Sequence, residues 1–207
     1  MNLFLTGASG FLGSRIIEAF AGRHSLRVLV RNPYLQSDFT GRGVECVTGD
    51  LESVHESMLE GIEGIIHAAA LAKPFGMWEE FRRTNIEGTR HLLDVGQSAG
   101  VKQFIYISTE AVCFRGQDLV NVNEDVPVLD RPIYEYGYSK AQAERLVLAA
   151  SRADFKTVAL RPSWIWGPGD TNALPMIVQM VQQGKFMWVD GKARKTTTYV
   201  DNLIDAI

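Results

Sequence analysis

A glycine cluster directly after the first apolar run is the feature that most constrains the fold. The chain begins MNLFLTGASGFLG, with Gly7, Gly10 and Gly13 following the apolar residues 3–5. Glycine weakens the interior of a regular element, so a cluster indicates a turn that must approach another group closely. An amphipathic helical pattern follows at 13–22. A strand, a glycine turn and a helix in this order predict a dinucleotide site, because the N–H groups at a helix N-terminus favour phosphate.

Short apolar runs alternate with helical patterns along the rest of the chain. The expected strands lie at 3–5, 26–30, within 43–50, 64–69, 103–109 and 156–162, and the expected helices lie at 13–22, 79–100 and 138–153. This alternation is typical of an α/β fold with a parallel sheet. The mostly apolar strands fit a sheet that is covered on both faces. We therefore expect a doubly wound Rossmann-type parallel sheet with helices on both faces.

Composition excludes several classes of function. The chain has 207 residues, enough for one full domain, and a net charge of −3 that gives no basic field for a nucleic-acid partner. No apolar run approaches the roughly 20 residues of a membrane helix, and the first residues lack the basic start of a signal peptide. Cys46 and Cys113 form no CxxC pattern, and the four histidines lack ligand spacing. We expect a cytoplasmic protein with reduced thiols, no membrane span and no metal.

A tyrosine and a lysine four residues apart suggest acid–base chemistry. Tyr136 and Lys140 lie in YGYSK, and Ser108 and Thr109 follow the expected strand at 103–109. If the tyrosine and the lysine lie on one helix, they share a face. A free tyrosine has a pKa of about 10 and is a poor base at neutral pH, but a nearby ammonium favours the phenolate and lowers the pKa. Tyr136 could then exchange a proton with an alcohol or a ketone.

Motifs spread over nearly the whole chain carry a family resemblance. They are TGASGFLG (6–13), GDL (49–51), HAAA (67–70), NIEGT (85–89), YIST (106–109), YGYSK (136–140), LRPSWIWGPGD (160–170) and TTYVDN (197–202). In this order they resemble the extended branch of the short-chain dehydrogenase/reductase superfamily, the NAD-dependent epimerase/dehydratase family. FRGQDLVNVNED (114–125), IWGPGD and TTYVDN look most like its 3β-hydroxysteroid dehydrogenase and 2-alkyl-3-oxoalkanoate reductase group.

The resemblance implies a set of site residues and a domain division. The implied catalytic residues are Thr109, Ser108, Tyr136 and Lys140. The implied cofactor-binding residues are Gly7, Gly10, Phe11, Leu12, Gly13, Arg31, Asp50, Leu51, Ala68, Ala69, Ala70, Asn85, Tyr136, Lys140 and Pro162. We expect a dinucleotide-binding domain at 1–165 and the start of a substrate-binding region at 166–207. We also expect most of the C-terminal substrate lobe to be missing.

The residue after the second expected strand bears on the cofactor. Arg31 stands where NAD-specific proteins carry an acid for the ribose 2′-hydroxyl. Arginine can pair with a 2′-phosphate, so NADP(H) is favoured, while NAD(H) stays open. The expected function is interconversion of a secondary alcohol and a ketone on a hydrophobic, steroid-like or 3-oxoacyl-derived substrate. A nucleotide-sugar epimerase or dehydratase and a non-catalytic NADP-binding sensor or scaffold are the alternatives, and a homodimer is left open.

Overall fold

A six-stranded parallel sheet forms the centre of the computed structural model, which describes all residues except 74, 172, 188–190 and 193. The strand order is β3-β2-β1-β4-β5-β6, and every neighbouring pair is parallel. The strands are β1 (Asn2–Thr6), β2 (Ser25–Val30), β3 (Glu45–Thr48), β4 (Gly64–His67), β5 (Gln103–Ile107) and β6 (Lys156–Leu160). The six expected strands are thus present, in the order of a doubly wound sheet.

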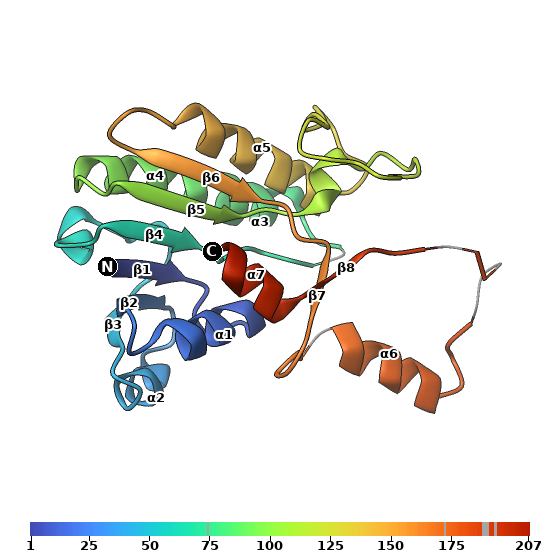
Figure 1. The fold of residues 1–207 in the computed structure, drawn as a ribbon, viewed down its shortest axis with the longest axis horizontal. Helices are drawn as coiled ribbons and strands as arrows, with labels where there is room; N and C mark the ends of the chain where they lie inside the picture. Colours follow the sequence, from blue (N-terminus) through green and yellow to red (C-terminus); the bar gives the residue numbers. More distant parts are fainter. Residues whose placement is uncertain (74, 172, 188–190, 193) are drawn as a thin grey trace.

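Helices cover the two faces of the sheet, as predicted (Figure 1). The chain moves outward from β1 to β3 and then in the opposite direction from β4 to β6, so right-handed crossovers place the two groups of helices on opposite faces. One face carries α1 (Phe11–Phe20) and α2 (Gln36–Thr40); the other carries α3 (Trp78–Phe81), α4 (Gly88–Ser98) and α5 (Glu135–Ala149). Two separate apolar clusters fill these layers, one around Ile16 and Ile17 of α1 and one around Leu92 and Val147 of α4 and α5.

The expected helix at 79–100 is divided in the structure. A π-helical segment, η3 (Arg82–Glu87), separates α3 from α4. The hydroxyl of Thr89 donates to the carbonyl of Asn85 at 2.7 Å, and such side-chain bonds compete with the regular helix ladder. The wider turn is therefore held by a buried contact that periodicity alone does not reveal. The expected helix at 138–153 also differs, since α5 begins at Glu135 and places Tyr136 in its first turn.

Three short 3₁₀ helices and a second, small sheet complete the described chain. The 3₁₀ helices are Pro33–Leu35, Glu56–Leu59 and Glu110–Cys113. In the second sheet β7 (Trp164–Trp166) pairs in parallel with β8 (Thr197–Tyr199), and α6 (Ala173–Gln182) lies between them in sequence. The proposed division at 165/166 falls inside β7.

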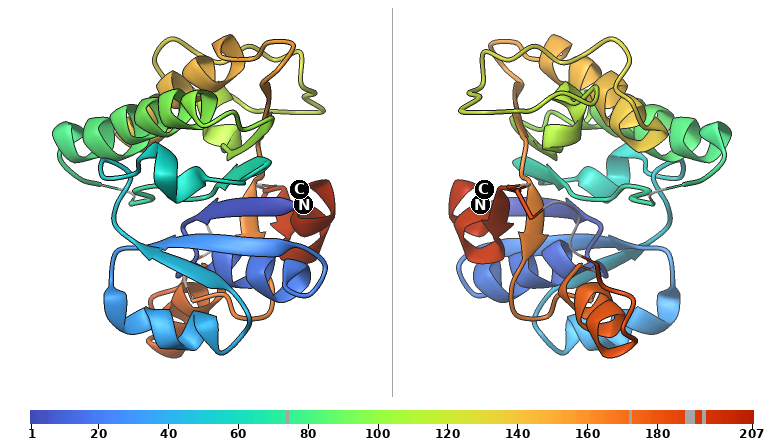
Figure 2. Two further views of the ribbon diagram at one scale, coloured as in Figure 1. Left: turned by 90° about the vertical axis from the view of Figure 1, so that its left-hand side faces the viewer. Right: turned by 90° about the vertical axis from the view of Figure 1, so that its right-hand side faces the viewer.

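The end of the described chain returns to its beginning. Helix α7 (Val200–Ala206) starts directly after β8 and packs beside α1, where Arg15 Nη2 lies 2.6 Å from Asp201 Oδ1. Figure 1 shows the β7–α6–β8 segment projecting from the main sheet, and Figure 2 shows α7 beside α1. The contact between α7 and α1 holds β8, which directly precedes α7, and its partner strand β7 near α1.

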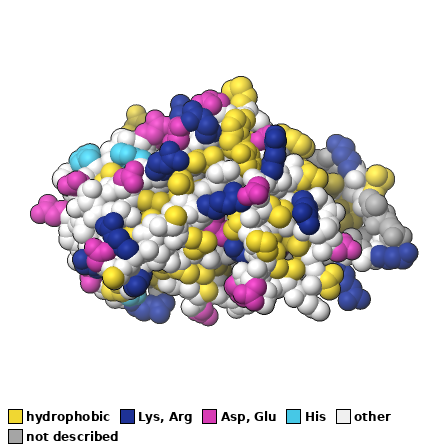
Figure 3. Space-filling model, turned by 90° about the horizontal axis from the view of Figure 1, so that it is seen from above, with side chains coloured by type: hydrophobic (Ala, Val, Ile, Leu, Met, Phe, Trp, Pro, Cys, Tyr) yellow, Lys and Arg dark blue, Asp and Glu magenta, His cyan; other side chains and the backbone are white. Residues whose placement is uncertain are grey.

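Acidic and basic side chains are interspersed on the face shown in Figure 3, with apolar side chains between them. This mixed pattern gives that face no field of one sign to attract a polyanion. Among the described residues, no helix combines the length and apolar character that crossing a membrane requires.

Candidate active site

The glycine turn brings α1 against the end of β4. Gly7 has a φ of +78°, and a Cβ on it would lie 2.7 Å from the backbone nitrogen of Ala69. A Cβ on Gly13 would lie 2.1 Å from the carbonyl oxygen of Gly7. Gly10 occupies the N-cap position, and no side chain caps the helix there. The turn therefore requires glycine at two positions and leaves the first N–H groups of α1 available to an anion.

A cavity of about 320 Å³ opens beside this turn. Its lining includes eight of the residues that the sequence predicts for the cofactor: Gly7, Gly10, Arg31, Asp50, Leu51, Ala68, Ala69 and Ala70. These residues come from the ends of β1, β2, β3 and β4, the carboxyl edge at which doubly wound sheets bind ligands. A groove bounded by Gly7, where a Cβ would strike the backbone, with an arginine at one wall, fits a dinucleotide.

Several lining residues escaped the sequence analysis. They are Ser9, Leu29, Glu52, Leu71, Arg83 and Thr84. Ser9 lies within the glycine motif and Glu52 directly follows GDL, so proximity to these motifs could have indicated both. Arg83 belongs to η3, and its Nε lies 3.3 Å from Glu52 Oε1 at the rim of the cavity. Nothing in its sequence context distinguishes Arg83 from a solvent-facing helical residue.

Other predicted cofactor residues lie outside this lining. Leu12 packs with the core beside α1, and Phe11 lies beside the turn at Pro168. The carbonyl of Pro162 accepts a hydrogen bond from the Glu110 N–H at 3.2 Å. Their roles toward a cofactor remain predictions.

Asn85 is buried and supports the cavity from behind. Its Oδ1 accepts from the Leu71 N–H at 2.7 Å, and its Nδ2 donates to the Leu71 carbonyl at 3.1 Å and to Ser139 Oγ at 2.9 Å. Ser139 Oγ in turn donates to the carbonyl of Tyr136 at 2.8 Å. Both amide hydrogens of Asn85 are thus used within the protein, so this side chain joins the cavity wall at Leu71 to the first turn of α5.

His67 is a buried, neutral histidine in the core. Its Nδ1 lies 2.7 Å from Thr6 Oγ1 and its Nε2 lies 2.9 Å from Thr89 Oγ1. Because the Thr89 hydroxyl donates to Asn85, His67 Nε2 must carry the hydrogen and Nδ1 must accept from Thr6. Burial, and next the charge of Lys140, lower the pKa of His67 to about 3. This histidine therefore links β1 to η3 and α4 without exchanging protons near neutral pH.

Tyr136, Lys140 and Thr109 meet where α5 packs on the end of β5. The Thr109 side chain lies beside the Tyr136 phenol and acts on its pKa, and Thr109 Oγ1 accepts from the Ala111 N–H at 3.3 Å. Burial raises the pKa of Tyr136 to about 12, and the Thr109 side chain opposes this shift. The expected lowering of the Tyr136 pKa by Lys140 is therefore wrong for this structure, because desolvation of the phenolate dominates.

Lys140 is buried between the sheet and α5. Its Nζ donates to the Ile107 carbonyl at 2.7 Å and lies 4.0 Å from the centre of the Tyr106 ring. Burial lowers the pKa of this ammonium to about 7, while Glu144 acts in the opposite direction. Lys140 is thus a cation whose charge changes within the physiological range.

Ser108 and Thr109 have different partners although they are adjacent. The hydroxyl of Ser108 donates to Glu144 Oε2, whereas Thr109 faces Tyr136. Of the two hydroxyls predicted to hold a substrate oxygen, Thr109 is therefore the one placed beside the phenol.

Phe114, Trp164 and Trp166 belong to the motifs that carry the family resemblance. We expect them to line a substrate cleft, but they are absent from the lining of the cavity beside the glycine turn. Trp166 packs edge-on against Tyr199, with ring centres 5.2 Å apart, and its Nε1 donates to Thr197 Oγ1 at 3.1 Å. Trp164 remains 39% exposed, and Phe114 is half-buried beyond the end of β5. A cleft built by Phe114, Trp164 and Trp166 remains a prediction.

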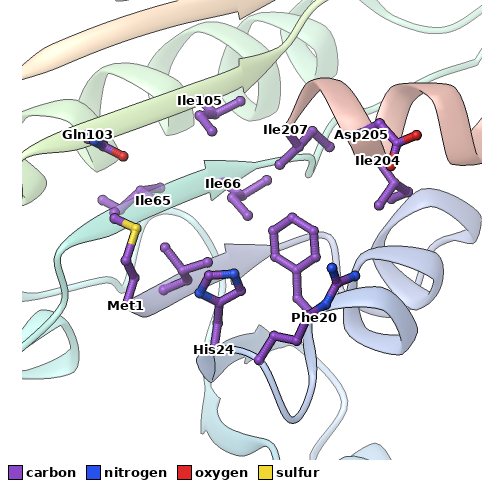
Figure 4. A pocket seen from close by; sticks show the side chains of 13 residues that line it. Met1, Phe20, His24, Ile65, Ile66, Gln103, Ile105, Ile204, Asp205 and Ile207 are labelled. Carbon is purple, nitrogen blue, oxygen red and sulfur yellow. The ribbon is translucent and has the colours of Figure 1, made fainter.

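A second cavity lies at the opposite end of the strands (Figure 4). Met1, Leu3, Gly64 and Gln103, which line it, belong to the amino ends of β1, β4 and β5, and Ile207 closes one side. It therefore lies away from the carboxyl edge that carries the tyrosine, the lysine and the glycine turn. Among the described residues, no three His, Cys, Asp or Glu side chains converge as a metal site, and both cysteines are free.

The fold and this site define the class of the protein. A doubly wound sheet, a glycine turn at its first strand and a Tyr–Lys pair beside the fifth are the features of extended short-chain dehydrogenases/reductases, as the sequence predicts. The model of the 3-beta hydroxysteroid dehydrogenase/isomerase family matches residues 4–207. The chain belongs to this family.

Curated relatives and solved structures agree with this assignment. A 4-hydroxy-2-methyl-3-oxo-4-farnesyl-3,4-dihydroquinoline-1-oxide ketoreductase of Stigmatella aurantiaca is 37% identical over 212 residues, which cover 100% of this chain and 63% of the relative. A 3 beta-hydroxysteroid dehydrogenase/Delta 5-->4-isomerase of Mycobacterium tuberculosis is 34% identical over 98% of this chain and 58% of its own length. The structure of MoeE5 in complex with UDP-glucose and NAD superposes with a TM-score of 0.82 at 28% identity, covering 100% of this chain and 70% of that one. The chain thus spans about three fifths of these curated relatives.

Proposed function

We propose that the protein is an NADP(H)-dependent oxidoreductase that interconverts a secondary alcohol and a ketone on a hydrophobic substrate. The observation that carries the proposal is the placement of Tyr136, Lys140 and Thr109 together at the end of β5, one strand from the Ala68–Ala70 wall of the glycine-turn cavity. The hydrogen bonds through Leu71, Asn85 and Ser139 join that wall to Tyr136, so the two halves of the site form one unit.

The residues of this chain divide the chemistry between them. A bound nicotinamide supplies or accepts the hydride. Thr109 and Tyr136 hold the substrate oxygen, and the Tyr136 hydroxyl donates the proton to it during ketone reduction. Because the pKa of Tyr136 is raised to about 12, the phenol carries its proton at neutral pH and is ready to act as the acid. The charge of Lys140 one turn later stabilises the phenolate that remains.

The substrate class follows from the relatives. The Stigmatella aurantiaca relative is named a ketoreductase of a farnesyl dihydroquinoline oxide, and a 32% identical relative from Stenotrophomonas maltophilia is named 2-alkyl-3-oxoalkanoate reductase. The substrates in both names combine a carbonyl group with hydrocarbon. Exposed Trp164 and Trp166, beyond the carboxyl edge of the sheet, offer apolar surface for such a substrate.

The test compares substrates on the full-length protein. NADPH oxidation is followed with 3-keto steroids, 2-alkyl-3-oxoalkanoates and UDP-sugars as separate substrates. Turnover of the lipophilic ketones supports the proposal. Turnover of UDP-sugars alone would favour an epimerase or dehydratase, in line with the ligand named for MoeE5. Saturable NADPH binding without turnover of any of these compounds would favour a sensor or scaffold.

Arg31→Asp is expected to reverse the cofactor preference. Arg31 lines the cavity at the end of β2, where its guanidinium can pair with a 2′-phosphate, whereas a carboxylate repels the phosphate and accepts from a 2′-hydroxyl. The wild-type protein should bind NADPH more tightly than NADH by about tenfold or more, corresponding to one charge-assisted pair. Calorimetric titration with both cofactors measures the ratio.

Arg42→Asp is the matched control for this substitution. Arg42 is exposed and lies outside the cavity lining. Replacing it with Asp therefore changes the net charge as Arg31→Asp does but leaves the cavity unaltered. It should leave the ratio of the two affinities unchanged. Equal affinity of the wild-type protein for both cofactors would refute the NADP(H) preference.

A further inference from the structure

A fully buried carboxylate lies one helical turn beyond Lys140. The side chain of Glu144 on α5 is 0% exposed. Its Oε1 lies 2.7 Å from Arg161 Nη2 and 2.8 Å from Arg161 Nε, and its Oε2 accepts from the hydroxyl of Ser108. A buried carboxylate is costly unless it is paired and hydrogen-bonded, and both conditions are met here.

These contacts connect three parts of the candidate site. Ser108 directly precedes Thr109 at the end of β5, and Arg161 follows the end of β6. Arg161 also donates from Nη1 to the Val126 carbonyl at 3.0 Å, in the long segment between β5 and α5. Glu144 therefore ties α5, which carries Tyr136 and Lys140, to the two strand ends that face it.

We propose that Glu144 is a positioning residue for proton transfer at Tyr136: its buried negative charge lies one helical turn from Lys140, and its hydrogen bonds hold Ser108 and Arg161 against α5. The proposal rests on the proposed function for its effect on turnover. Its effect on Lys140 does not depend on that function: both side chains are buried on α5 four residues apart, and they bond to the consecutive residues Ile107 and Ser108.

The groups around Lys140 show why one carboxylate matters. From β4 it faces His67, which is neutral, and from β5 it faces the Tyr106 ring and the Ile107 carbonyl. On its own helix, the charged group that acts on it is Glu144, one turn later, while Tyr136, one turn earlier, is protonated near neutral pH.

Arg161 pairs with Glu144, and the carboxylate still raises the pKa of Lys140 in the presence of this pair. Burial acts the other way and brings this pKa to about 7. Glu144 is thus the anion that opposes the loss of charge at Lys140.

The experiment titrates Lys140 directly in the full-length protein. Heteronuclear NMR of lysine labelled at Cε and Nζ gives its pKa, with the Lys140→Met spectrum as the assignment. In Glu144→Gln we expect the acid dissociation constant of Lys140 to rise about tenfold or more, which lowers its pKa by about one unit or more, because the negative charge that stabilises the ammonium is gone. Starting from a pKa of about 7, the charged fraction at pH 7 then falls about fivefold. The midpoint of the pH dependence of kcat that reports the loss of charge at Lys140 should move to lower pH by the same number of pH units as the Lys140 pKa.

Two further variants separate charge from simple loss of a contact. Glu144→Asp keeps the charge but shortens the reach to Ser108 and Arg161, so the pKa of Lys140 should stay near 7. In Glu144→Asp, a fall as large as the one expected for Glu144→Gln would overturn the proposal, so this variant tests the role of the charge even if the Gln variant does not fold. Glu60→Gln, which removes an exposed carboxylate, is the control and should shift nothing.

The outcomes distinguish this proposal from the proposed function. An unchanged Lys140 pKa in Glu144→Gln refutes the role of Glu144, whatever the turnover. A lowered Lys140 pKa in a protein that turns over none of the ketones supports the charge relationship and refutes the proposed reaction.

Discussion

Tyr136→Phe is expected to lower kcat by about 10²- to 10⁴-fold, the usual contribution of a positioned general acid. The substitution removes only the phenolic hydroxyl, so packing on α5 is retained and Thr109 loses one partner. The glycine-turn cavity does not include the Tyr136 ring among its lining residues. Affinity for NADPH should therefore change by less than about threefold, less than the effect of one hydrogen bond.

Tyr134→Phe is the matched control for this prediction. Tyr134 is 54% exposed, two residues before Tyr136 and at the N-cap of α5. Its hydroxyl has no role in the proposed reaction, so kcat should remain near the wild-type value. Steady-state kinetics with the best ketone substrate and calorimetry with NADPH give the two quantities. Near-normal turnover of Tyr136→Phe would show that another group delivers the proton.

The sheet and the glycine turn could be predicted because their signals are local. Each strand is a short apolar run, and Gly7 and Gly13 mark the one turn in which a Cβ would strike backbone atoms. The placement of Tyr136 and Lys140 on one helix followed from their spacing, although α5 begins three residues before the expected start.

The other features depend on contacts between distant segments. The Thr89 hydroxyl bonds the carbonyl of Asn85 within the π-helical segment η3. The side-chain amide of Asn85 forms hydrogen bonds to Leu71 and Ser139, which lie far away in sequence. Arg83 reaches the cavity only because η3 lies beside the end of β3. The parallel pairing of β7 with β8 joins segments that are more than 30 residues apart, a separation that periodicity does not record.

The direction of the Tyr136 pKa illustrates why spacing alone is insufficient. Two residues four apart on a helix share a face, but their coupling depends on where the charge lies and how much water surrounds it. Lys140 directs its Nζ to the Ile107 carbonyl and the Tyr106 ring. Desolvation then outweighs attraction, and the phenol is a stronger candidate for an acid than for a base in this state.

Lys140→Met is expected to stabilise the folded protein while it abolishes most turnover. The folded pKa of Lys140 is about 7, below the ordinary value of 10.5, so the unfolded chain binds this proton more tightly. The cost of burying the charge is therefore greatest below pH 7 and declines as the pH rises toward 10.5. A tenfold difference in proton affinity corresponds to about 1.4 kcal/mol, so the gain in unfolding free energy is on the order of a few kcal/mol near pH 7.

Urea unfolding of the full-length protein at pH 6, 7, 9 and 10.5 measures this gain. Methionine retains an unbranched apolar chain that can pack on Tyr106, and Glu144 keeps Arg161 and Ser108 as partners. Lys156→Met, at an exposed position on β6, is the control and should give no pH-dependent gain. A Lys140→Met protein that is less stable than the wild type at every pH would show that the ammonium contributes more to the fold than its burial costs.

A stabilising substitution that removes activity would identify the reason for a lysine at this position. Packing alone would be served better by an apolar side chain, since a buried cation lowers stability at neutral pH. The surrounding groups reduce that cost without removing it: a neutral His67 adds no repulsion, the Ile107 carbonyl accepts a hydrogen bond, and Glu144 supplies a counter-charge. Such an arrangement is expected where chemistry requires the cation, because active sites commonly retain destabilising groups that function needs.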